Sequence, residues 1–145
     1  MDPREFLTLA RQLSLATTES AWRSAISRAY YAAFHVARQL LEDLGFTVPH
    51  GDRAHGYLWL RLSNCSEAAV EQAGRDLNDL RRQRNSADYD LARPVRSGIA
   101  QIHEQLATQI IRVFESAALE PTRTQITDAM KIYERDVLHD VTWHP

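Results

Sequence analysis

Apolar residues recur at three- and four-residue spacing along nearly the whole chain. This period is typical of amphipathic helices, whereas a half-buried strand alternates apolar and polar residues with a period of two. No alternating run rich in valine or isoleucine is present. The pattern therefore predicts an all-α fold.

Two helices are predicted in the first 45 residues. Asp2 can cap the first helix and Pro3 suits its first position, and that helix is expected to end near Leu15. Thr17 or Thr18 can cap the second helix, which is expected to end at Gly45. The apolar stripes predicted for these helices are Phe6, Leu9 and Leu13, and then Trp22, Ile26, Ala29, Ala33, Val36, Leu40 and Leu44.

A loop is predicted over residues 45–52, where glycine and proline cluster. Asp52 can cap a short helix that follows. Asn64 and Glu67 stand at the spacing of a capping box and predict a second long helix over about 66–90. The inner positions of the short helix are expected to be Leu58, Leu60 and Leu62.

Proline residues delimit the last two predicted helices. Pro94 interrupts the periodic pattern, Pro121 ends the next helix, and residues 123–139 form a final one. The inward face predicted between the two prolines consists of Ile99, Ile102, Leu106, Ile110, Val113 and Phe114. No repeat, low-complexity segment or flexible linker separates these elements.

The size and charge of the chain limit the classes of function. A chain of 145 residues fits one domain, and a formal charge of −2 argues against nonspecific coating of nucleic acid. Cys65 is the only cysteine, and no signal peptide or long apolar run is present, so we expect a cytoplasmic, soluble protein. Lys131 is the only lysine among 17 basic residues, which indicates either phosphate recognition by arginine or, as we favour, a coding bias.

A cluster of charged and polar residues lies near the end of the second long helix. Arg81, Arg82 and Arg84 share one turn and are followed by Asn85, Ser86, Ala87, Asp88 and Tyr89. Arg84 and Asp88 lie four residues apart and share a helix face. They form either an ordinary surface ion pair or part of a site that holds a phosphate, with the Tyr89 hydroxyl at its mouth.

The first long helix contains small residues and aromatic residues, from Ser27 to His35. Phe34 is expected in the core. Tyr30, Tyr31 and His35 carry polar groups that need partners when buried, so one or more of them can face the Arg84 cluster. For His35 a packing role is the main alternative.

No metal or cofactor is predicted from the remaining polar residues. His50 and His55 lie five residues apart, but no cysteine or glutamate completes a ligand set, and no helix fixes their geometry. The sequence also lacks a phosphate-binding glycine loop and a nucleophile elbow.

Two motifs in this order resemble the HEPN superfamily: Ser27-Arg28-Ala29-Tyr30-Tyr31-Ala32-Ala33-Phe34, and Arg84-x-x-Ala87-Asp88-Tyr89. The chain is most similar to small stand-alone prokaryotic members with an Arg-x-x-Ala-Asp-Tyr motif. The resemblance covers about residues 5–118, which predicts a HEPN-like bundle over 1–118 and an additional C-terminal helix and tail over 119–145.

The resemblance implies an up-and-down bundle of about five to six helices that dimerises and places two arginine motifs at one cleft. Many HEPN proteins cut RNA there without a metal, by attack of a ribose 2′-hydroxyl on the adjacent phosphate. In nuclease members four to six residues separate the arginine from a following histidine. Here Tyr89, Asp90 and Leu91 stand instead, so His35 or His55 would have to supply the imidazole.

The main hypothesis is a toxin or defence component that binds RNA at a dimeric cleft and can cleave it. The alternatives are a non-catalytic regulatory subunit, as for HEPN proteins encoded beside a minimal nucleotidyltransferase, and a helical scaffold without a ligand. The predicted site comprises Arg84, Asp88 and Tyr89 as catalytic residues and Arg81, Asn85, Tyr30, Tyr31 and His35 as RNA- or nucleotide-binding residues. The small residues predicted to let two copies approach closely are Ala29, Ala32, Ala33 and Ala37.

Overall fold

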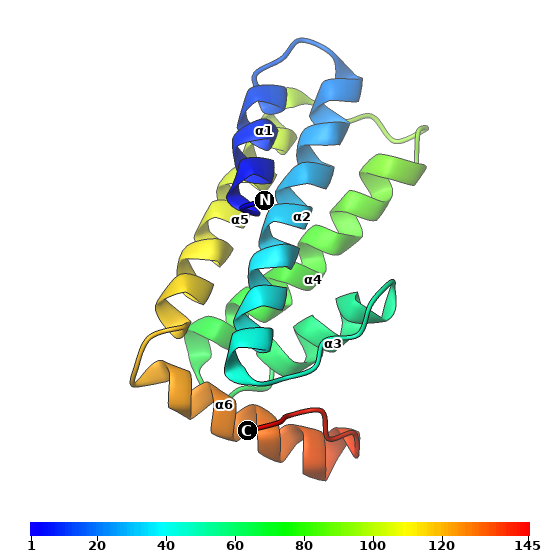
Figure 1. The fold of residues 1–145 in the computed structure, drawn as a ribbon. Coiled ribbons are helices and arrows are strands. Elements are labelled where there is room, and N and C mark those ends of the chain that lie inside the picture. The colour runs from blue at the N-terminus through cyan, green and yellow to red at the C-terminus, as the bar shows by residue number, and fades with distance from the viewer.

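The computed structural model describes all 145 residues and confirms the all-α prediction (Figure 1). The helices form a bundle, and the only β-type pairing is one isolated bridge near the C-terminus. The elements are α1 (Arg4–Ser14), α2 (Glu19–Leu44), α3 (Arg53–Leu62), α4 (Ala68–Tyr89), α5 (Ser97–Ala117), α6 (Thr122–Tyr133) and a π-helical turn, η1 (Glu134–Leu138).

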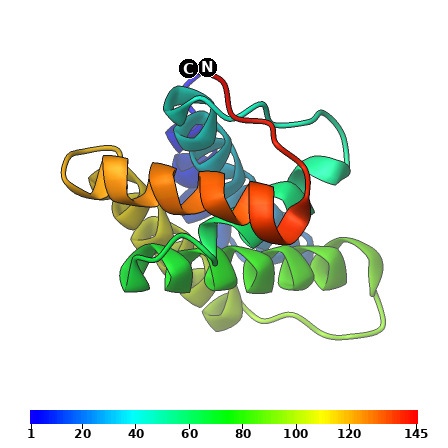
Figure 2. The same cartoon turned by 90° about the horizontal axis from the view of Figure 1, so that it is seen from below.

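Helix α2 is the centre of the bundle and packs against α1, α4 and α5. Figures 1 and 2 show that α6 crosses one end of these lengthwise helices, while the shorter α3 lies beside α4. None of the helices combines the length and the apolar composition needed to cross a bilayer.

Side chains and glycines fix several helix ends as the sequence predicts. The Thr18 hydroxyl accepts a hydrogen bond from Ala21 N at 3.3 Å, and Gly45 ends α2 with a φ of +107°. The start of α4 differs from the prediction, because Glu67 itself caps the helix by accepting from Val70 N at 2.8 Å. Asn64 instead donates to the Leu60 carbonyl, so the expected capping box is absent. Asp52 also makes no side-chain cap.

The buried faces of α1 and α5 differ from the predicted stripes. Leu9, Ile99 and Ile102 are exposed, by 40%, 44% and 58%, which contradicts their assignment to the core. The positions buried in their place are mostly small: Leu7, Ala10, Ala100 and Ala107. Ile110 and Phe114 are buried as predicted. Ala100 packs in one cluster with Ala25 and Ile26 of α2, where small side chains let the two helices approach closely.

The alanine face of α2 is used for packing within the chain. Ala29, Ala32, Ala33 and Ala37 each have no exposed surface and belong to the main core. These residues are therefore unavailable for contact with a second copy, and the predicted basis for dimerisation was wrong. Close helix approach occurs, as expected for small residues, but it joins α2 to its neighbours in the same chain.

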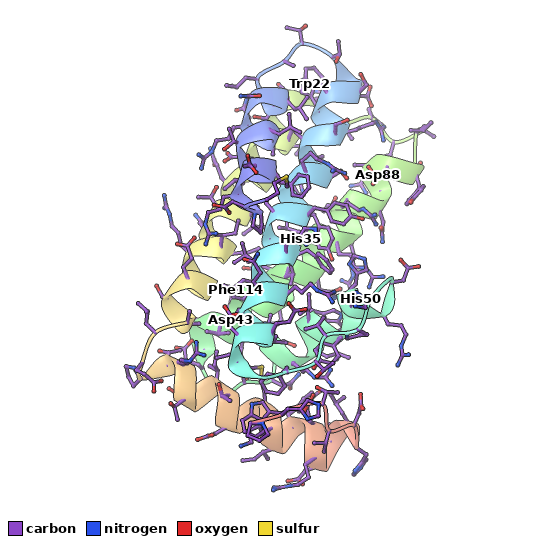
Figure 3. The ribbon with its side chains drawn as sticks, in the orientation of Figure 1. Trp22, His35, Asp43, His50, Asp88 and Phe114 are labelled. Carbon is purple, nitrogen blue, oxygen red and sulfur yellow. The ribbon has the colours of Figure 1, made fainter.

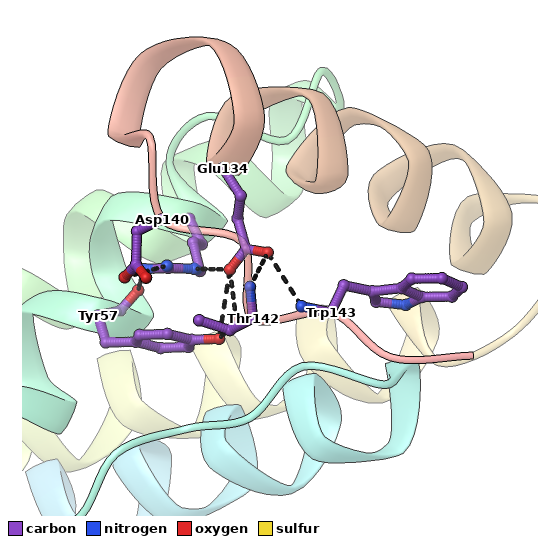
Figure 4. Close-up of polar contacts among 6 residues, drawn as sticks. Tyr57, Glu134, Asp140, Thr142 and Trp143 are labelled. Carbon is purple, nitrogen blue, oxygen red and sulfur yellow. Dashed lines mark hydrogen bonds and ion pairs between the residues drawn. The ribbon is translucent and has the colours of Figure 1, made fainter.

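A buried ion pair and a short tail close the end of the bundle crossed by α6. Glu134 has no exposed surface, and its Oε2 lies 2.8 Å from Arg61 Nε (Figure 4). The same carboxylate accepts hydrogen bonds from the backbone N–H groups of Thr142 and Trp143. It thereby holds residues 139–145, here called the C-terminal strap, whose Trp143 forms the isolated bridge with Phe46.

Candidate functional site

A cleft of about 630 Å³ lies between the start of α3 and the last turns of α4. Figure 3 labels His50, just before α3, and Asp88, near the end of α4, on the two segments that border it. The residues that line the cleft are Asp52, His55, Arg81, Arg84, Asn85, Ser86, Tyr89 and Asp90. Two arginines of the predicted cluster, Arg81 and Arg84, therefore face a hollow rather than a convex surface.

Arg84 is held in a fixed orientation by its neighbours. Its side chain is 15% exposed, and its guanidinium donates to Asn85 Oδ1 at 2.7 Å and to the Tyr31 hydroxyl. The guanidinium carbon also lies 4.9 Å from the centre of the Tyr31 ring. A guanidinium that a ring and two acceptors already hold in place loses little conformational entropy when it binds a phosphate. This pre-organisation favours anion binding.

Asp88 positions Arg84 rather than lining the cleft. Its Oδ2 lies 3.1 Å from Arg84 Nε, although the Nε–H is not aligned for a hydrogen bond, and it accepts one from Ser27 Oγ at 3.4 Å. The two side chains are 15% and 28% exposed, so this is a largely buried pair and not the ordinary surface pair considered above. A direct role for Asp88 with a ligand stays a prediction.

Arg81 shares the cleft but has no protein partner. No carboxylate lies within 4.0 Å of its guanidinium, and its buried Nε makes no hydrogen bond. Arg82, by contrast, points outward with a side chain 71% exposed and lies 3.6 Å from Asp79. A buried polar group normally finds a hydrogen-bond partner, so Arg81 is the group in the cleft that most needs an anion.

His55 enters the cleft from α3. Its residue surface is 8% exposed, and its Nδ1 pairs with the Tyr30 hydroxyl in the core, while Nε2 has no partner. Burial lowers the pKa of His55, and the positive charges of Arg81 and Arg84 lower it further, against a weaker opposing effect of Asp52. Burial likewise raises the pKa of Tyr30, so the phenol stays protonated.

A family model described as the HEPN domain matches residues 4–134. The chain belongs to the HEPN family. Neither a curated protein nor a solved structure matches it significantly.

The HEPN match extends from α1 to the first residue of η1 and includes α6. The division of the chain at residue 118 stays a prediction, as does membership of the group with the Arg-x-x-Ala-Asp-Tyr motif. The correspondence of Tyr89 with the histidine of nuclease members also stays a prediction. Tyr89 is 76% exposed at the end of α4, and its hydroxyl makes no hydrogen bond in this chain.

The other predicted ligand-binding residues of this HEPN chain are not all brought to the cleft. Tyr31 contacts Arg84 directly, and Tyr30, 1% exposed, can act only through His55. His35 lies midway along α2 (Figure 3) and stacks on Phe6 of α1 with ring centres 5.8 Å apart. His35 therefore has the packing role predicted as the main alternative. Burial lowers the pKa of His35, and the positive charge of Arg38 lowers it further.

Sequence reasoning left open which histidine lies near Arg84. His35 and His55 are both candidates in the sequence, but only His55 lines the cleft. The deciding contact joins Tyr30 to a residue 25 positions further along the chain, and helical periodicity does not relate residues of different helices.

Proposed function

We propose that this HEPN protein binds RNA through the cleft formed by α3 and α4 and acts as a toxin or defence component. The proposal rests on the side-chain contacts of Arg81 and Arg84. Arg84 is oriented by Tyr31 and Asn85, and Arg81 has no counter-ion. Arginine recognises phosphate through paired N–H donors, and each charge-assisted contact contributes about 1.5–3 kcal/mol.

The lining of the cleft supports a phosphate ligand over an apolar one. Only Tyr89 among its eight lining residues offers a large apolar surface. Apolar small molecules select pockets lined mainly by hydrophobic side chains. Because the whole chain has a formal charge of −2, attraction for RNA has to be local, and the cleft offers Arg81 and Arg84 for it beside the carboxylates of Asp52 and Asp90.

HEPN domains commonly dimerise, and we propose that two copies of this chain pair so that their arginine motifs share one binding surface. The alanine face of α2 is buried and does not serve this contact. The proposal is tested by sedimentation at micromolar concentration, in the same samples used for RNA binding. A mass of two chains supports the dimer, and a mass of one chain contradicts it.

Arg81→Ala is expected to weaken RNA binding by about 10- to 100-fold, the equivalent of one charge-assisted phosphate contact. Thermal stability should change little, because Arg81 makes no ion pair or hydrogen bond that would be lost. Fluorescence anisotropy of a labelled single-stranded RNA at fixed salt measures the affinity. Arg82→Ala is the matched control, since it removes the same charge from the adjacent, outward-facing position. Equal affinities of the two variants would contradict the proposal.

A second function is favoured by the exposure of Tyr89. Its hydroxyl is free of protein partners and stands at the rim of a cleft that holds two arginines. In a system paired with a nucleotidyltransferase, this oxygen can accept a transferred nucleotide while the arginines bind its phosphates. We therefore propose regulation by a nucleotidyltransferase partner as the alternative to free RNA binding.

Tyr89→Phe is expected to preserve the fold and abolish covalent nucleotide transfer to the chain, because it removes the acceptor oxygen alone. Incubation with a minimal nucleotidyltransferase and radiolabelled ATP, followed by mass spectrometry, measures the modification. Tyr133→Phe provides a control on another helix. Undiminished labelling of Tyr89→Phe, or labelling of Tyr133, would remove Tyr89 from this role.

A further inference from the structure

The cleft contains an imidazole that the arginine motif itself lacks. No histidine follows Arg84 at the nuclease spacing, yet His55 reaches the same cleft from α3. Its Nδ1 is fixed by the Tyr30 hydroxyl, so the ring cannot turn without losing a buried hydrogen bond. The ring nitrogen left without a protein partner is Nε2, which lies on the edge of the ring away from Tyr30.

We propose that His55 is the proton-transfer residue of an RNA-cleaving site, with Tyr30 as its positioning residue and Arg81 and Arg84 as its phosphate-binding residues. The proposal rests on the proposed binding of RNA and adds a reaction to it. Its substrate class is single-stranded RNA with a free 2′-hydroxyl beside the phosphate that the arginines hold. In nuclease members the histidine follows the arginine on the same helix. Here the Tyr30–His55 pair, from α2 and α3, takes the place of that histidine.

The reaction is an internal transesterification. The ribose 2′-oxygen forms a bond to phosphorus, the bond from phosphorus to the 5′-oxygen breaks, and the 2′,3′-cyclic phosphate and a 5′-hydroxyl result. When Nδ1 donates its hydrogen to the Tyr30 oxygen, Nε2 has a lone pair that accepts the 2′-hydroxyl proton. The imidazolium then returns a proton to the leaving 5′-oxygen, so atoms and charge balance. The arginines stabilise the charge that develops on the phosphate oxygens.

The surroundings of His55 suit the neutral, proton-accepting form. The groups that face it are Tyr30 on α2, Arg81 and Arg84 on α4, and Asp52 at the start of its own helix. Burial and then the two arginines lower its pKa from the ordinary 6.5, so the ring is neutral at neutral pH. Cleavage should therefore persist through pH 6.5 and decline only at lower pH, as the base becomes protonated.

The test uses His55→Asn, because the asparagine amide can retain the hydrogen bond to Tyr30 while removing the group that exchanges protons. We expect RNA affinity and melting temperature close to those of the unmodified protein and a fall in cleavage rate of about 100-fold or more. Cleavage is followed by gel electrophoresis with chelator present, and the cyclic phosphate is identified by mass spectrometry. His50→Gln, five residues away on the preceding loop and exposed, is the matched control.

The outcomes distinguish this inference from the proposed RNA binding. Cleavage by the unmodified protein but not by His55→Asn supports the inference, as does an unmodified protein whose kcat/KM declines only below pH 6.5. Undiminished cleavage by His55→Asn overturns it. Binding of RNA without cleavage also overturns it but leaves the proposed function intact, whereas a protein that does not bind RNA contradicts both. If His55→Asn does not fold, the pH profile decides the question, and cutting of a 2′-deoxy strand would overturn the proposed reaction.

Discussion

Glu134→Ala is expected to lower the free energy of unfolding by about 3–5 kcal/mol, the typical effect of leaving one partner of a buried ion pair alone. Arg61 is 2% exposed, and its Nε lies 2.8 Å from Glu134 Oε2. Its second nearby carboxylate, Asp140, is more distant at 3.6 Å and largely exposed. The cation would therefore remain buried without an adequate counter-ion.

The same substitution releases the C-terminal strap. Glu134 accepts hydrogen bonds from Thr142 N at 2.9 Å and Trp143 N at 3.2 Å, so its loss leaves two backbone donors without their acceptor (Figure 4). Urea denaturation measures the stability, and hydrogen exchange at the strap reports its release. Adding Arg61→Met to the variant should recover part of the loss, because the unpaired charge is then gone. A loss of less than about 1 kcal/mol, typical of an exposed pair, would contradict this account.

Acid should weaken the same pair. Burial acts to raise the pKa of Glu134, but the hydrogen bonds from Thr142 and the pairing with Arg61 outweigh it and leave that pKa below the ordinary 4.5. A carboxyl whose pKa is depressed on folding stabilises the protein above its unfolded value. The stabilisation by Glu134 is therefore fully present at neutral pH and is lost as the pH falls through the depressed pKa.

Arg84→Ala is expected to abolish RNA-directed activity and to reduce RNA affinity by about 100-fold. It should also lower the free energy of unfolding by about 1–2 kcal/mol, because Asp88 and the Tyr31 hydroxyl lose a partner in a partly buried setting. The loss of RNA binding and activity is expected to exceed the loss of stability, because Arg84 is not part of the main hydrophobic core.

Arg84→Lys separates charge from geometry at the same position. It retains the positive charge but cannot contact Asn85 and Tyr31 through one planar fork as the guanidinium does. We expect intermediate affinity with activity still strongly reduced, measured by anisotropy and by RNA cleavage or toxicity. Full activity in Arg84→Lys would show that only charge matters, and a collapse in melting temperature for Arg84→Ala would make Arg84 structural.

Local sequence determined the helices and most of their ends. The 3.6-residue period, Thr18 and Gly45 predict α2 correctly, because capping and glycine conformation depend on neighbours within one turn. The pairing of Arg84 with Asp88 is predictable for the same reason, since the helix itself places residues four apart on one face.

The tertiary structure decided which residues are buried and which histidine faces the arginines. Ile102 is exposed while Ala100 and Ala107 are buried, because the packing of α5 against its neighbours decides which side of the helix faces the core. Arg61 meets Glu134 across 73 positions, and Tyr30 meets His55 across 25. Such pairs depend on how the helices cross and on which side chains become buried where they cross. The spacing of apolar residues within a single helix does not predict the crossing or the buried pairs.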